Sequence, residues 1–199
     1  MRLVKEYVFL DSNIYVGKNE KYDILGEQYK DLIKKCCEYS AFFSLDITYG
    51  KPSFFDTLCE FEMIDMSFVH RIRDISDTNL KGAVGVGFED MSQMIEAAQN
   101  GWLKFYNVSE KSCELLTNVT NSIFSWKFGR DGVNAERLSF YRADGSIIFC
   151  SNSKICFLDL RENEDFDDII SKSPWLSANG WSLTYLDKGL HSDSPMKIV

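Results

Sequence analysis

The residues best suited to chemistry in this sequence are carboxylates that gather in one short stretch of the second half. This stretch contains five acidic side chains, namely Glu162, Glu164, Asp165, Asp167 and Asp168. Clustered carboxylates attract a basic protein surface, because opposite charges steer association and fix the orientation of the partner. Acidic residues also stabilise the first turn of a helix, so the stretch has an ordinary structural interpretation as well. We predict that these five residues bind a protein partner.

The histidines and cysteines do not predict a metal centre or a nucleophilic pair. The two histidines, His70 and His191, are far apart in sequence, whereas zinc sites use cysteines and histidines at short fixed spacings. The six cysteines include the adjacent Cys36 and Cys37 and lie in apolar stretches, as small buried side chains do. We therefore expect reduced thiols, no metal, no cofactor and no self-sufficient catalytic site.

An acidic residue also follows the first predicted strand. Residues 8–14 place Asp11 directly after an apolar run, and this segment resembles the first motif of PIN-type ribonucleases. In that family the matching aspartate helps to hold a divalent metal, and Asp165 with Phe166 resembles the family's late acidic motif. The resemblance implies a metal-dependent ribonuclease, which requires several converging carboxylates and a parallel sheet. The alternative interpretation of Asp11 is a polar turn at the end of a strand.

A longer resemblance surrounds a predicted hairpin. Trp126 and the stretch ERLSFYRADGS at residues 136–146 resemble a segment of small bacterial toxin-immunity proteins, such as those of contact-dependent growth inhibition and similar polymorphic-toxin systems. The resemblance implies a non-enzymatic protein that binds and neutralises a toxin domain, with a cationic nuclease as one candidate toxin. The hairpin motif itself is structural and indicates no chemistry.

The elements that must position the acidic residues have clear patterns. Apolar residues flank Asp144 and Gly145, and this dipeptide supplies the positive φ that a tight hairpin needs. The hairpin strands and a strand at 155–160 form a predicted three-stranded meander. The five acidic residues then fill the first turns of a predicted helix, whose inner face is Phe166, Ile169 and Ile170.

Patterns in the rest of the chain predict further helices and strands. Apolar residues recur at three- and four-residue steps from Tyr22 to Cys37, which indicates an amphipathic helix. Other helices are predicted with a cap at Ser53, at residues 91–99, and from Ser109 to near Trp126. Strands are predicted at residues 3–10, 42–48, 102–108 and 181–186.

Length and composition indicate a single folded domain. The 199 residues are 45% hydrophobic with three prolines, which suits one well-formed core rather than a disordered chain. We expect a single α+β domain at residues 1–199, with a largely antiparallel sheet and several helices packed on it. Residues 189–199 are expected to form a loosely held tail.

The net charge restricts the partners of this chain. A formal charge of −8 disfavours binding to nucleic-acid backbone or anionic membrane and favours a basic protein partner. Charged residues near the N-terminus interrupt the apolar region that a signal peptide would need. No apolar stretch of the sequence is long enough to span a bilayer. We expect a cytoplasmic protein with no nucleic-acid or membrane partner, and the oligomeric state stays open.

Overall fold

The structure of the protein is a computed structural model, which describes residues 5–10, 24–63, 104–128, 131–151, 155–171 and 182–184. The strands are β1 (Lys5–Leu10), β2 (Phe42–Tyr49), β3 (Phe105–Asn107), β4 (Asn134–Tyr141), β5 (Ile147–Ser151), β6 (Ile155–Leu160) and β7 (Ser182–Thr184). The helices are α2 (Gly26–Tyr39), α3 (Pro52–Cys59), α7 (Glu110–Val119), α8 (Ser125–Phe128) and α9 (Asp167–Ser171).

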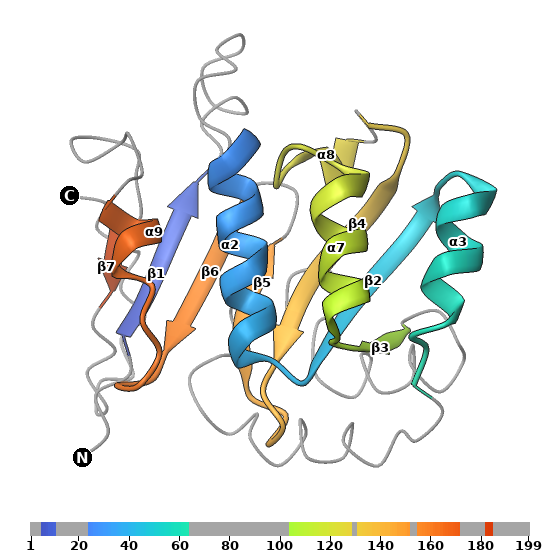
Figure 1. Cartoon of the computed structure of the whole chain (residues 1–199). Coiled ribbons are helices and arrows are strands. Elements are labelled where there is room, and N and C mark those ends of the chain that lie inside the picture. The colour runs from blue at the N-terminus through green and yellow to red at the C-terminus, as the bar shows by residue number, and fades with distance from the viewer. Residues whose placement is uncertain are drawn as a thin grey trace, which may run out of the picture.

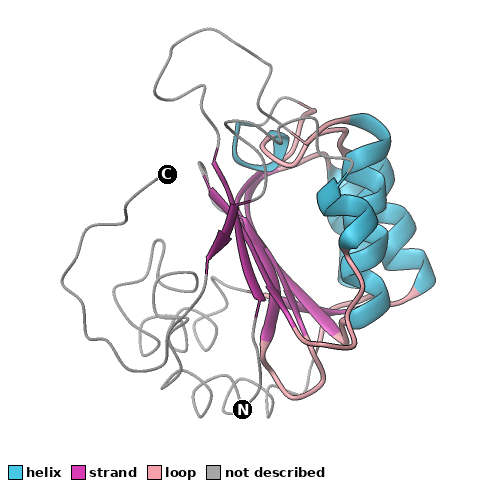
Figure 2. Ribbon diagram, turned by 90° about the vertical axis from the view of Figure 1, so that its left-hand side faces the viewer, coloured by secondary structure: helices cyan, strands magenta, loops and turns pink. Residues whose placement is uncertain are grey.

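The described strands form one seven-stranded sheet in the order β3-β2-β4-β5-β6-β1-β7. Every neighbouring pair of these strands runs antiparallel. The helices α2, α3 and α7 lie on one face of the sheet, as Figures 1 and 2 show. The predicted α+β class with a largely antiparallel sheet is confirmed, and β4, β5 and β6 form the predicted meander.

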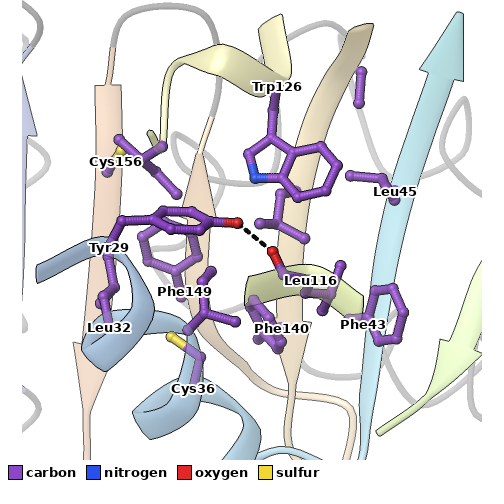
Figure 3. Close-up of a cluster of buried hydrophobic side chains, with 14 of the residues drawn as sticks. Tyr29, Leu32, Cys36, Phe43, Leu45, Leu116, Trp126, Phe140, Phe149 and Cys156 are labelled. Atoms are coloured by element: carbon purple, nitrogen blue, oxygen red, sulfur yellow. Dashed lines mark hydrogen bonds between the residues drawn. The ribbon is translucent and has the colours of Figure 1, made fainter. Parts of the chain in front are cut away.

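Helix α2 forms because its apolar residues repeat with the helical period. Tyr29, Leu32, Ile33 and Cys36 all lie on one side of the helix and are all fully buried against the sheet. Tyr29 also donates a hydrogen bond of 2.7 Å to the carbonyl of Leu116 in α7 (Figure 3). The two helices are therefore joined by a buried polar contact as well as by apolar packing.

The predicted N-cap of α3 and the predicted end of α7 were wrong. Ser53 lies inside α3 and does not cap it, because Pro52 occupies the first turn and Lys51 is the N-cap. The helix from Ser109 ends at Val119 and does not continue to Trp126.

A polar break separates α7 from α8. Thr120 has extended backbone, and its hydroxyl donates to the carboxylate of Asp131 at 2.5 Å. The backbone N–H of Asn121 donates to the same carboxylate at 3.1 Å. The Asp131 carboxylate thus gives the Thr120 hydroxyl and the Asn121 N–H partners outside the helix, at the point where the helix ends.

A row of aromatic side chains runs from the edge strand β3 to β5, the middle strand of the sheet. Tyr106, Phe43, Phe140 and Phe149 are opposite one another in β3, β2, β4 and β5, in that order. Their neighbouring ring centroids are 5.1, 6.0 and 6.3 Å apart. Figure 3 shows Phe43, Phe140 and Phe149 beneath the helices, together with Trp126. All four side chains of this aromatic row belong to the hydrophobic core.

Several sequence predictions concern residues outside the described ranges. They are Asp11, His70 and His191, the helix at residues 91–99 and the tail at residues 189–199. Within the described ranges, no helix combines the length and the apolar character that crossing a membrane requires.

Candidate protein-binding surface

The acidic stretch forms the connection from β6 to α9 and the start of that helix. Since α9 begins only at Asp167, the prediction that all five acidic residues lie in helical turns was wrong. The N–H of Glu164 bonds to the carbonyl of Arg161 at 3.0 Å, and the Asp165 carboxylate accepts from the N–H of Asp167 at 3.0 Å. Glu164 and Asp165 therefore belong to turns in the connection, before the helix starts.

A buried ion pair holds this connection to the β4–β5 hairpin. The side chains of Arg142 and Glu164 are 6% and 4% exposed, and two N–H groups of the guanidinium donate to the two carboxylate oxygens. The remaining three donate to Ser146 Oγ at 3.1 Å and to the carbonyls of Ile147 and Asp159, both at 2.6 Å. All five donors of the arginine are therefore satisfied, as burial of such a group requires.

A second, more exposed pair lies beside the first. Arg161 forms an ion pair with Asp144, in which the side chains are 22% and 49% exposed. The Asp144 carboxylate also accepts from the N–H of Ser146 at 3.0 Å, across the hairpin turn. In that turn Gly145 has a φ of +85°, which confirms the predicted hairpin and its glycine. The hairpin turn and the acidic connection are thus one hydrogen-bonded unit.

These contacts change the acidity of two carboxyl groups. Burial alone raises the pKa of Asp144, but hydrogen bonds from Ser146 and Arg161 outweigh it and lower this pKa to about 2. Burial also raises the pKa of Glu164, but the bonds from the Arg142 side chain and the Arg161 backbone prevail, and the pKa is below its ordinary value. Both groups are therefore held in the charged form near neutral pH.

The lowered pKa values predict a loss of stability in acid. A carboxyl whose pKa is depressed by folding stabilises the protein above its unfolded pKa, and the effect disappears as the pH falls through the folded value. The free energy of unfolding should therefore decrease from about pH 5 toward about pH 2, measured by urea denaturation at several pH values. In the Asp144→Asn variant the free energy of unfolding should decrease less steeply as the pH falls. If this variant and the unsubstituted chain have the same pH profile, the lowered pKa assigned to Asp144 is contradicted.

Helix α2 supports the other side of the acidic connection. The N–H of Asp165 donates to the hydroxyl of Tyr39 at 3.2 Å, and the ring of Tyr39 packs on Phe166 with centroids 5.7 Å apart. Phe166 is fully buried, and Ile169 and Ile170 are packed on the core as predicted. The connection is thus fixed by an ion pair on one side and by aromatic packing on the other.

Four of the five predicted partner-binding residues present their side chains to solvent. Glu162, Asp165, Asp167 and Asp168 are exposed, and we call these four residues the acidic surface. Glu164 differs, because its carboxylate is buried against Arg142. In the parts of the chain that the structure describes, no group of three or more side chains could hold a metal ion.

Two other residues have roles that the sequence patterns did not assign. Trp126 is 1% exposed and belongs to the core, so it is unavailable as an interface anchor. Arg142 organises the acidic connection, yet its only signal in the sequence is a basic residue at the end of an apolar strand.

Comparisons with known proteins found no match: no protein-family model, no curated protein and no solved structure matches this chain.

Proposed function

We propose that this chain is a non-enzymatic, immunity-type protein that binds and neutralises a toxin domain in the cytoplasm through its acidic surface. The observation that carries the proposal is the Arg142–Glu164 ion pair, which fixes the backbone that bears the four exposed carboxylates. A binding site that is rigid before its partner arrives loses less conformational entropy on association. The Glu164 carboxylate fixes the segment that carries the four exposed carboxylates, which is consistent with a preorganised binding surface.

The charge of the chain indicates the chemistry of the partner. With a net charge of −8, the chain repels polyanions and attracts a basic domain. The acidic surface places four of its negative charges close together in the sequence, where they attract a basic domain most strongly. Exposed charges of this kind mainly accelerate association, and salt weakens their effect. A cationic nuclease is a toxin class with the complementary charge, since its active site must itself attract a polyanionic substrate.

Association with a toxin encoded beside this chain tests the proposal. The chain should be co-expressed with the product of the adjacent gene and purified through a tag on one partner. We expect a stoichiometric complex, and we expect cells that express the neighbouring protein to survive only when this chain is present. Failure to copurify, or survival without this chain, would overturn the proposal.

A single substitution separates this proposal from the ribonuclease alternative. The antiparallel pairing of all the described strands differs from the parallel sheet of PIN-type ribonucleases, and Asp11 lies outside the described residues. Replacing Asp11 by Asn should leave protection of the cells intact if the chain is an inhibitor. The alternative requires instead a ribonuclease activity of the purified chain that this substitution abolishes.

A further inference from the structure

A partly exposed cation lies next to the acidic surface. Arg161 directly precedes Glu162 in the sequence, and its side chain is 22% exposed. The carbonyl of Arg161 also accepts the N–H of Glu164 at 3.0 Å, so both residues belong to the same turn. A positive charge at this place repels a basic partner and attracts the neighbouring carboxylates. The position of the Arg161 guanidinium therefore affects what the acidic surface can bind.

The guanidinium of Arg161 is bound by the turn of the β4–β5 hairpin. Its Nη2 group donates to the carboxylate of Asp144 and to Ser146 Oγ, the latter at 2.8 Å. The hydroxyl of Ser146 donates in turn to the Asp144 carboxylate at 2.6 Å. Asp144 and Ser146 thus bind one nitrogen of the guanidinium and are bonded to each other, and we call these two residues the turn clamp.

The turn clamp is itself held in place by the buried arginine of the hairpin. Arg142 donates from its Nη1 group to Ser146 Oγ at 3.1 Å, and the backbone N–H of Arg142 donates to the Ser146 carbonyl at 2.8 Å. The N–H of Gly145 donates to the Arg142 carbonyl at 2.9 Å, which closes the turn. Ser146 is only 7% exposed. The hydroxyl that contacts Arg161 is therefore fixed by buried contacts.

We propose that Asp144 and Ser146 are positioning residues, which hold the Arg161 guanidinium in the hairpin turn and keep its positive charge away from the acidic surface. The inference rests on the proposed function, because it concerns the surface that the toxin would contact. An arginine side chain is long and flexible. Once released from the turn clamp, Arg161 would pair with carboxylates of the acidic surface and compete with the basic groups of the partner.

Nuclear magnetic resonance of the chain without a partner tests the turn clamp itself. In Asp144→Asn the new side chain still accepts from the N–H of Ser146, and an Asn-Gly pair suits a hairpin turn, so we expect this variant to fold. The guanidinium signals of Arg161 should be distinct in the unsubstituted chain and should merge with those of freely rotating arginines in the variant. The signals of the buried Arg142 should persist in both chains. Identical Arg161 signals in the two chains would overturn the inference.

Calorimetric titration against the toxin tests the consequence for binding. We expect Asp144→Asn to weaken binding by about fivefold, because it releases Arg161 toward the acidic surface. The control Asp56→Asn removes the same charge from an exposed position in α3 and should change binding by about twofold or less. Arg161→Met should bind at least as tightly as the unsubstituted chain, because no competing cation remains.

The double variant of Asp144→Asn with Arg161→Met distinguishes the turn clamp from a direct contact. If Asp144 acts only by holding Arg161, the double variant should bind as tightly as Arg161→Met alone. If the double variant stays as weak as Asp144→Asn, Asp144 contacts the toxin itself and the inference is overturned. Unchanged binding in Asp144→Asn would overturn this inference alone. Absence of binding by the unsubstituted chain would instead refute the proposed function, and this inference with it.

Discussion

Replacing Arg142 by methionine is expected to lower the free energy of unfolding by about 3–5 kcal/mol. The substitution leaves the carboxylate of Glu164, which is 4% exposed, without its cationic partner. It also removes the donors to the carbonyls of Ile147 and Asp159. An unpaired buried charge is among the most destabilising changes in a protein, because the desolvation of the charge is no longer compensated. Urea denaturation near pH 7 would measure the loss.

The neighbouring exposed pair supplies the control for this experiment. Arg161→Met removes a pair whose side chains are 22% and 49% exposed, so we expect a loss of about 1 kcal/mol or less. Combining Arg142→Met with Glu164→Leu should destabilise less than the sum of the two single changes, because the double variant leaves neither charge unpaired. Equal losses in Arg142→Met and Arg161→Met would contradict the assigned role of the buried pair.

Replacing Phe140 by alanine should also lower the free energy of unfolding by about 3–5 kcal/mol. Phe140 is fully buried in β4, one of the two inner strands of the aromatic row, and packs on the rings of both Phe43 and Phe149. The substitution leaves a cavity in a sheet whose neighbouring strands are fixed by hydrogen bonds, so the surroundings can relax only in part. Urea denaturation would measure this loss as well.

Phe55 is the matched aromatic control. Its side chain belongs to α3 and is 36% exposed, so Phe55→Ala should lower the free energy of unfolding by about 1 kcal/mol or less. A similar loss in Phe55→Ala and Phe140→Ala would contradict the placement of the aromatic row in the buried core.

The elements that the sequence predicted correctly depend on local patterns. The buried face of α2 repeats at three- and four-residue steps, and the hairpin turn needs a residue that tolerates a positive φ at position 145. Both requirements are satisfied within a few residues, so the sequence alone displays them. The capping box at Ser109 likewise marks the start of α7 within four residues.

The order of strands in the sheet depends on distant contacts and was not predictable. β1 lies between β6 and β7, and β2 joins β3 to β4, although long segments separate these strands in the sequence. The apolar spacing up to Trp126 favoured one long helix after Ser109. The carboxylate of Asp131, ten residues beyond Asn121, instead accepts hydrogen bonds at the break.

The candidate site likewise has a part that the sequence predicts and a part that depends on distant contacts. The acidic character of residues 162–168 is visible in the sequence, but the separate role of Glu164 depends on Arg142, which is 22 positions earlier. Dipole complementation favoured a helix from Glu162 onward, whereas the buried pair and the packing of Phe166 on Tyr39 impose a turn instead. Tertiary contacts therefore determine which carboxylates are exposed.

The affinity of the copurified toxin for two charge-matched variants tests the central claim most directly. One variant neutralises the acidic surface, with Glu162→Gln, Asp165→Asn, Asp167→Asn and Asp168→Asn. The other neutralises four exposed carboxylates on α2, α3 and α7 and next to α3, with Asp31→Asn, Asp56→Asn, Glu60→Gln and Glu114→Gln.

Both variants change the net charge equally, so calorimetric titration of each against the toxin isolates the effect of position. We predict that neutralising the acidic surface weakens binding by about tenfold or more, whereas the second variant stays within about threefold of the unsubstituted chain. Equal weakening in both variants, or undiminished binding after neutralisation of the acidic surface, would contradict the proposal that this surface holds the partner.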